Sequence, residues 1–143
     1  MSLYAFDCSG TVEFYDCDPM GVVWHGNYVR YLESARGRFL DMIGYPYAEI
    51  DRDGFAFPIV ELRLKYTGSL RLRDCYTVTT HLDEYENRLV HSFEVRSGER
   101  LCLRARSVQV CVPRGGDSLT FCMPGRFVSC VRTFLAEAGH AAG

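Results

Sequence analysis

Two aspartates and a histidine stand within one short stretch whose residue types suit acyl chemistry. The stretch is YDCDPMGVVWHGNY, residues 15–28, and it contains Asp16, Asp18 and His25. A carboxylate can attack a carbonyl carbon or activate water, while unpaired amides at a helix start can hold a developing oxyanion. Acyl transfer or hydrolysis needs this combination. A plain turn is the alternative, because aspartates in turns commonly accept hydrogen bonds from nearby backbone N–H groups, and a lone histidine is more often structural.

The local pattern indicates how these groups would meet. A strand period of two predicts that Asp16 and Asp18 lie on one face of an expected strand, close to the helix that follows. The segment from Val23 to Asn27 leads into that helix, whose N–H groups and positive dipole end favour an anion. Gly21 and Gly26 allow close approach of the backbone and a substrate. We therefore expect an anion-binding corner beside a carboxylate.

A first strand and a long helix are expected to position this corner. Residues 4–16 predict the strand, which Pro19 and Gly21 interrupt. The helix is predicted over Asn27–Ile43, with Asn27 as a typical N-cap and Gly44 as its stop. Apolar residues recur at steps of three and four, with charged residues on the other side. The apolar positions are Tyr28, Leu32, Ala35, Phe39, Leu40, Met42 and Ile43, and the charged ones are Arg30, Glu33, Arg36, Arg38 and Asp41.

The remainder of the chain predicts an antiparallel sheet. Residues 51–54 read as a loop, and alternation then predicts four strands and a final helix. The strands are expected at 55–66, 75–86, 89–96 and 101–112, and the helix at 124–138. Short turns between strands imply antiparallel pairing. The simplest architecture is an α+β arrangement in which the sheet wraps a central helix.

Composition excludes several classes of protein. The length of 143 residues suits one domain. The net charge of -2, with no basic block, disfavours nucleic-acid binding. No apolar run is long enough for a membrane span, and the first residues lack a signal-peptide pattern, so a cytoplasmic protein is expected. The seven cysteines and four scattered histidines predict neither a disulfide framework nor a metal site. No cofactor is expected.

The motif resembles a known family. The run Asp16-x-Asp18-x-x-Gly21-Val22-Val23-x-x-x-Asn27-Tyr28, followed by Tyr31-Leu32-Glu33-x-x-Arg36, is similar to hotdog-fold acyl-CoA thioesterases of the 4-hydroxybenzoyl-CoA thioesterase type. FPIVELRLKY, RDCYTVTTHLDEYENRLVHSFEV and RLCLRARSVQVCV extend the resemblance over residues 10–113. MGVVWHGNYVRYLESAR, GYPYAEI and ENRL resemble the branch of aryl-polyene pathways most. The resemblance implies one hotdog domain over 1–143, with its core at about 10–113 and a C-terminal extension at 114–143.

The resemblance also implies roles for individual residues. Asp18 matches the catalytic carboxylate, acting as nucleophile or general base, and Gly21 matches the turn. The amides of Val23, Trp24 and His25 match the oxyanion contact, and the His25 side chain matches a histidine that assists catalysis in some branches. Tyr28 and Trp24 are expected to line the acyl pocket or to pack in the core, and Asp16 to support the turn. Glu33 is the second candidate for the catalytic carboxylate, because another hotdog branch uses a helix carboxylate. An ion pair between Glu33 and Arg36 is favoured over that catalytic role.

The expected substrate is an acyl-CoA or an acyl carrier protein, as in fatty acid and lipid metabolism. Among the basic residues that could bind CoA phosphates, Arg88 is preferred over Arg63, Lys65, Arg71 and Arg73. The resemblance further implies a homodimer with active sites at its interface, or a tetramer. Two alternatives remain: an acyl-CoA-binding hotdog without catalysis, and a hotdog 3-hydroxyacyl dehydratase. The second is disfavoured because His25 precedes Gly26-Asn27-Tyr28 rather than a proline-rich stretch.

Overall fold

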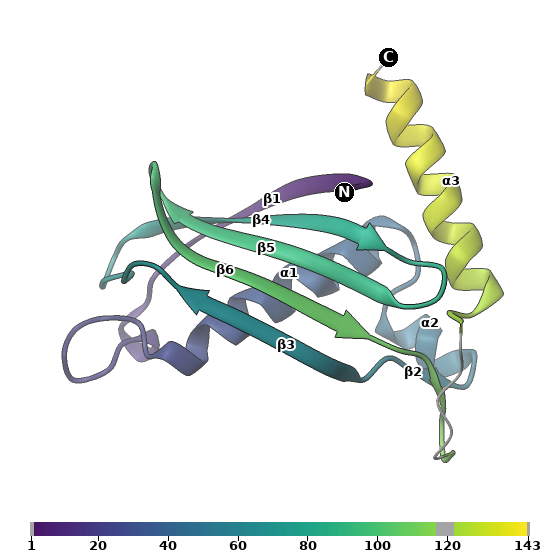
Figure 1. Ribbon diagram of the computed structural model, residues 1–143, viewed down its shortest axis with the longest axis horizontal. Helices are drawn as coiled ribbons and strands as arrows, with labels where there is room; N and C mark the ends of the chain where they lie inside the picture. Colours follow the sequence, from purple (N-terminus) through teal and green to yellow (C-terminus); the bar gives the residue numbers. More distant parts are fainter. Residues whose placement is uncertain (1, 117–121, 143) are drawn as a thin grey trace.

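A five-stranded antiparallel sheet carries the fold (Figure 1). The computed structural model describes residues 2–116 and 122–142. The sheet consists of β1 (Tyr4–Thr11), β3 (Ile59–Tyr66), β4 (Cys75–Glu84), β5 (Leu89–Ser97) and β6 (Arg100–Gln109), in the order β1-β4-β5-β6-β3. Every neighbouring pair is antiparallel. The predicted antiparallel α+β architecture is confirmed, and β1 and β3 form its two edges.

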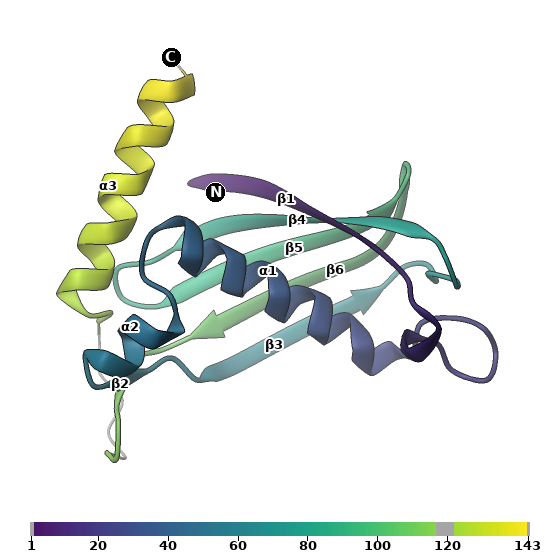
Figure 2. The ribbon, with the colours of Figure 1, turned by 180° about the vertical axis from the view of Figure 1, so that it is seen from behind.

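The helix α1 (Tyr28–Met42) lies along one face of this sheet (Figure 2). The predicted apolar stripe is largely correct, because Leu32, Ala35 and Phe39 are fully buried against the sheet. One expectation is wrong: Arg36, predicted on the charged side, is only 3% exposed and pairs with Glu33. Gly44 ends the helix as predicted, with a φ of 76° that glycine adopts without strain.

Shorter elements complete the chain. A two-stranded sheet pairs β2 (Phe55–Ala56) with β7 (Val112–Pro113), and α2 (Tyr47–Arg52) precedes it. The C-terminal helix α3 (Gly125–Ala142) closes one end of the core, where Phe127 and Val131 are fully buried. Two single-turn 3₁₀ helices, η1 (Phe14–Asp16) and η2 (His25–Asn27), flank the loop between β1 and α1. None of the described helices is long and apolar enough to span a membrane.

Several predicted boundaries differ from the structure. The strand predicted over 4–16 ends at Thr11, and η1 follows, so Asp16 and Asp18 do not share a strand face. The strand predicted over 55–66 is divided into β2 and β3 at Phe57-Pro58, because proline lacks the N–H that a ladder needs. The region 101–112 is likewise divided into β6 and β7. The helix α2 was not predicted.

Candidate active site

The residues between β1 and α1 form a tight hairpin, which joins the aspartates of the predicted site to the segment that enters α1. The N–H of Asp18 donates to the carbonyl of Val22 at 2.8 Å, and the N–H of Trp24 donates to the carbonyl of Asp16 at 3.0 Å. Cys17 and Val23 form an antiparallel bridge between these two bonds. The hairpin therefore holds Asp18 across from the segment that enters the helix.

The carboxylate of Asp18 is oriented by its own turn. Its Oδ1 atom accepts the N–H of Met20 at 2.8 Å, and its carbonyl accepts the N–H of Gly21 at 3.0 Å. Gly21 has a φ of 79°, a backbone conformation that residues with a Cβ rarely adopt. The side chain of Asp18 remains partly exposed, so one carboxylate oxygen is fixed by the turn while solvent or a substrate can reach the group.

Asp16 accepts hydrogen bonds within the turn, as predicted. It is only 5% exposed, and its Oδ2 atom accepts the N–H of Glu13 at 2.9 Å. Its carbonyl accepts both the N–H of Trp24 and the Nδ2–H of Asn27, the latter at 2.8 Å. Asn27 occupies the N-cap position of α1, as predicted, but its side chain makes no capping hydrogen bond there because it ties the helix entry to the carbonyl of Asp16.

The structure narrows the set of possible oxyanion donors. The N–H of Val23 donates to the carbonyl of Leu70 at 2.8 Å, and that of Trp24 is bonded to Asp16, so the first two predicted amides are occupied. Within residues 2–116 and 122–142, no backbone carbonyl accepts the N–H of His25 or Gly26. These two amides stand at the start of η2, where a helix leaves its first donors unpaired.

Two aromatic residues predicted to bind substrate have different environments. Trp24 is 49% exposed, and its ring lies 4.9 Å from the ring of His25. Tyr28 is 2% exposed, and its hydroxyl accepts the N–H of Leu70 at 3.1 Å. Of the two expectations for Tyr28, acyl pocket or core, the structure places it in the core. Trp24 and the exposed imidazole of His25 remain available at the surface of the site.

Glu33 and Arg88 are each paired with neighbouring side chains. Glu33 forms the predicted ion pair with Arg36 and accepts the hydroxyl hydrogen of Tyr47 at 3.3 Å. Arg88 lies in the turn between β4 and β5, paired with Glu84 at 3.0 Å. That turn is at the α3 end of the sheet, whereas the loop between β1 and α1 is at the opposite end (Figure 1).

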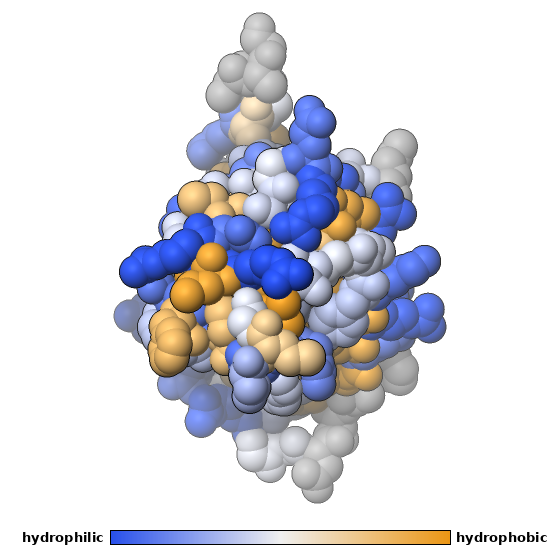
Figure 3. Space-filling view, turned by 90° about the vertical axis from the view of Figure 1, so that its left-hand side faces the viewer, coloured by the Kyte–Doolittle hydropathy of each residue, from blue (hydrophilic) through white to orange (hydrophobic). Residues whose placement is uncertain are grey.

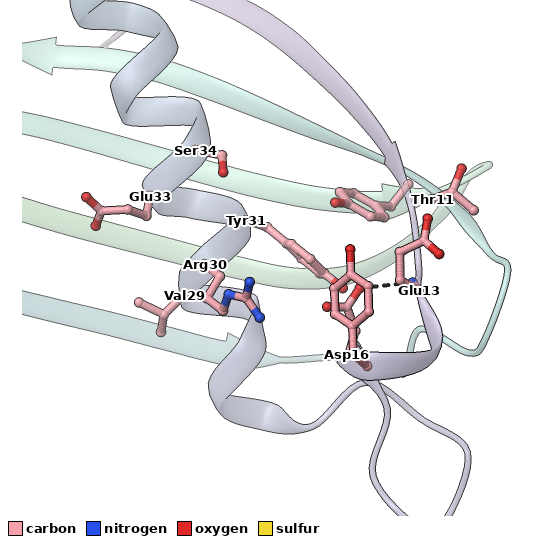
Figure 4. Close-up of a pocket in the computed structure, with 10 residues that line it drawn as sticks. Thr11, Glu13, Asp16, Val29, Arg30, Tyr31, Glu33 and Ser34 are labelled. Atoms are coloured by element: carbon pink, nitrogen blue, oxygen red, sulfur yellow. Dashed lines mark hydrogen bonds between the residues drawn. The ribbon is translucent and has the colours of Figure 1, made fainter. Parts of the chain in front are cut away.

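A cavity of about 480 Å³ lies on the β1 side of α1 (Figure 4). It is lined by Thr11, Glu13, Tyr15, Asp16, Val29, Arg30, Tyr31, Glu33, Ser34 and Tyr76. The ring of Tyr31 stacks on that of Tyr76 at 4.4 Å, and the side chain extends toward Asp16. Burial, and then the nearby carboxylate of Asp16, raises the pKa of Tyr31. Sequence reasoning did not identify this tyrosine pair, since it depends on packing between distant segments.

The end of the molecule that carries the site exposes apolar side chains. Phe14, Met20, Trp24 and Leu72 are each between 45% and 82% exposed. Figure 3 looks onto this end and shows apolar surface interspersed with charged side chains. Four cavities lined by described residues include neither Asp18 nor His25. A single chain thus presents the predicted catalytic groups on an open, partly apolar surface.

Comparisons with known proteins agree with the predicted resemblance. A family model described as "Thioesterase-like superfamily" matches residues 12–127. A Bacillus subtilis protein named a putative acyl-CoA thioesterase is 26% identical over 106 residues, covering 72% of this chain and 76% of that protein. The 4-hydroxybenzoyl-CoA thioesterase of a Pseudomonas species is 28% identical over 117 residues, covering 76% and 83%. A three-dimensional structure of that enzyme superposes with a TM-score of 0.75 at 25% identity, covering 88% of this chain and 98% of the other. The predicted resemblance to thioesterases of the 4-hydroxybenzoyl-CoA thioesterase type and the hotdog fold are confirmed, whereas the aryl-polyene branch stays a prediction.

Proposed function

The chain belongs to the Thioesterase-like superfamily, and on that premise we propose that it hydrolyses acyl-CoA or acyl-carrier thioesters with Asp18 as the catalytic carboxylate. The observation that carries this proposal is the hairpin between β1 and α1. It holds a partly exposed carboxylate in its own turn and ties it, through the carbonyl of Asp16, to the start of the helix. The amides of His25 and Gly26 there are the donors that remain for an oxyanion.

The reaction would proceed in one of two ways. In the first, a carboxylate oxygen of Asp18 attacks the thioester carbonyl carbon, the C–S bond breaks, and the thiolate leaves and is protonated. Water then opens the mixed anhydride, releasing the acid and regenerating Asp18. In the second, Asp18 accepts a proton from water as that water attacks the carbonyl carbon. Both routes consume one water, need no cofactor, and place negative charge on the carbonyl oxygen. Multiple turnovers in ¹⁸O water distinguish them: label in the Asp18 carboxylate indicates the anhydride route.

We propose a homodimer as the working unit. The edge strand β3 exposes Ile59, Val60 and Leu62, each at least 36% exposed, and an open edge of this kind favours pairing with another strand. Pairing of two β3 strands would bring the α3 end of one chain toward the loop end of the other. Arg88 would then serve the CoA phosphates of a substrate that reacts at the partner's carboxylate.

The first test is thiol release from a panel of acyl-CoA and acyl-carrier substrates. Wild type should release thiol from at least one of them, and Asp18→Ala should lower kcat by about 10²–10⁴-fold, the usual contribution of such a group. Asp41→Ala is the matched control, since Asp41 is an exposed carboxylate near the other end of α1. No thiol release by wild type would exclude hydrolysis of these substrates, and full activity of Asp18→Ala would exclude the residue assignment.

The second test asks whether the site is shared between two chains. Asp18→Asn and Arg88→Ala protomers are mixed, and kcat/KM is measured at low substrate concentration. If a site combines Asp18 of one chain with Arg88 of the other, each mixed dimer contains one intact site, and activity rises above that of both parents. If both groups come from one chain, every site keeps one defect and mixing restores nothing. A chromatographic mass of one chain would contradict the dimer itself. The proposed cellular location is the cytoplasm.

A further inference from the structure

The peptide group that joins His25 to Gly26 is held by a tyrosine from a distant strand. The hydroxyl of Tyr66, the last residue of β3, donates to the carbonyl of His25 at 2.7 Å. In a trans peptide the C=O of one residue and the N–H of the next belong to the same planar group and point in opposite directions. The hydrogen bond from Tyr66 therefore fixes the direction in which the N–H of Gly26 points.

Tyr66 is itself held by two further aromatic rings. Its ring makes edge contacts with Tyr28, at 5.5 Å between centroids, and with His25, at 6.4 Å. Tyr28 is anchored in the core through its bond from the N–H of Leu70. Partial burial raises the pKa of Tyr66, so its hydroxyl keeps its proton and remains a donor. The position of the hydroxyl is thus set by the core as well as by β3.

The lack of a side chain at Gly26 is required by its neighbour. A Cβ atom placed at Gly26 would lie 2.2 Å from the ring of Trp24. The indole ring therefore packs directly against this glycine, and the peptide between His25 and Gly26 is confined by Trp24 on one side and by the Tyr66 hydroxyl at its carbonyl. Such confinement is what preorganised oxyanion donors need, because a donor that must reorient during the reaction contributes less.

We propose that Tyr66 is a positioning residue for the oxyanion hole, acting through the His25–Gly26 peptide rather than by contact with the substrate. The hydrogen bond it donates orients that peptide and polarises it, which strengthens the N–H of Gly26 as a donor. This inference rests on the proposed thioester hydrolysis, in which negative charge develops on the carbonyl oxygen. Since that charge is largest in the transition state, Tyr66 affects kcat more than substrate binding.

The kinetic test replaces only the hydroxyl. Tyr66→Phe keeps the ring contacts and should lower kcat about tenfold with KM within about twofold, less than the 10²–10³ that follows loss of a whole oxyanion donor. Tyr4→Phe is the control, because it removes a hydroxyl from the start of β1, where the ring packs on Phe134 at 5.0 Å. It should leave both constants unchanged. A wild-type kcat for Tyr66→Phe would overturn the inference while leaving thioester hydrolysis intact.

A spectroscopic test reads the peptide directly and does not depend on turnover. The chain contains a single His-Gly step, at residues 25–26, so labelling histidine with ¹³C at the carbonyl and glycine with ¹⁵N yields one carbonyl–amide correlation for this peptide. In Tyr66→Phe the ¹³C signal of the His25 carbonyl should move upfield, and in Tyr4→Phe it should stay in place. An unchanged signal in Tyr66→Phe would overturn the inference whatever the activity. If wild type releases no thiol, the proposed function fails, and the catalytic role of Tyr66 fails with it.

Discussion

Replacing Gly21 by alanine tests whether the turn at Asp18 matters for catalysis beyond its contribution to stability. Gly21 has a φ of 79°, and a Cβ added there would meet no atom within 4 Å. The substitution therefore introduces backbone strain without a clash. The left-handed backbone conformation costs alanine roughly 1–2 kcal/mol. Alanine also lowers the conformational entropy of the unfolded chain, which offsets up to about 1 kcal/mol of that cost. The expected net loss of stability is about 1 kcal/mol, or about 3 °C in Tm for a chain of this size.

Gly44 provides a matched control for this strain. It has a φ of 76° and equally open surroundings, but it lies at the other end of α1. Gly21→Ala and Gly44→Ala should therefore lose similar stability in urea titrations. Only Gly21→Ala should lose activity, because relaxation of its turn displaces the Asp18 carboxylate that accepts the N–H of Met20. A displacement of about 1 Å can lower the rate up to about 100-fold, and we expect a loss of at least about tenfold in kcat.

The kcat values of Gly21→Ala and Gly44→Ala are compared under conditions in which stability does not limit activity. Thiol release is measured at saturating substrate, at a temperature where both variants are fully folded by circular dichroism. Gly21→Asn should recover part of the lost kcat, because asparagine tolerates left-handed backbone better than alanine. Equal kcat values for Gly21→Ala and Gly44→Ala would refute the view that this turn positions the reacting carboxylate.

Three further predictions concern the surrounding structure. His91 is fully buried, and burial, followed by the charge of Arg36, lowers its pKa from 6.5 to about 3. Between pH 6.5 and about 3 the His91 imidazole is protonated in the unfolded chain but not in the folded one, so the free energy of unfolding falls as the pH decreases through this range. His91→Gln should therefore reduce the slope of the free energy of urea unfolding against pH by up to about 1.4 kcal/mol per pH unit. Glu33→Gln should keep kcat within about threefold in the thiol-release assay, and a loss comparable to Asp18→Ala would make Glu33 the catalyst instead. Phe127→Ala should lower the free energy of unfolding by about 3–5 kcal/mol, because Phe127 is fully buried between Tyr45 and Phe57; a change below 1 kcal/mol would mean that α3 is not part of the core.

The architecture was largely predictable from the sequence, because hydrophobic periodicity reflects which side of each element is buried. The stripe on α1 and the alternation in β4, β5 and β6 predicted a sheet packed on one helix. Arg36 was placed on the wrong side, since the long side chain of an arginine can be buried when its charge is paired, and periodicity does not register such a pairing. The division at Phe57-Pro58 was not predicted because a single proline is also compatible with the start of a continuous strand.

The site was only partly predictable. Residue types and spacing predicted a carboxylate beside an anion-binding corner, and the family resemblance assigned the chemistry to Asp18 and the supporting role to Asp16. Which amides are unpaired was not predictable, because the partners of Val23 and Trp24 are carbonyls fixed by the folded hairpin and by Leu70. The contribution of Tyr66 depends on contacts across 41 residues of sequence, which no local pattern encodes.

The most direct test of the central claim is the kcat of Asp18→Asn in the thiol-release assay. Asparagine preserves the acceptor for the N–H of Met20, so the hairpin is retained while the carboxylate charge is removed. Asp41→Asn serves as the control for loss of a carboxylate elsewhere on the surface. The account predicts a Tm within about 2 °C of wild type and a kcat lowered at least about 100-fold for Asp18→Asn alone. A folded Asp18→Asn protein with wild-type kcat would contradict it.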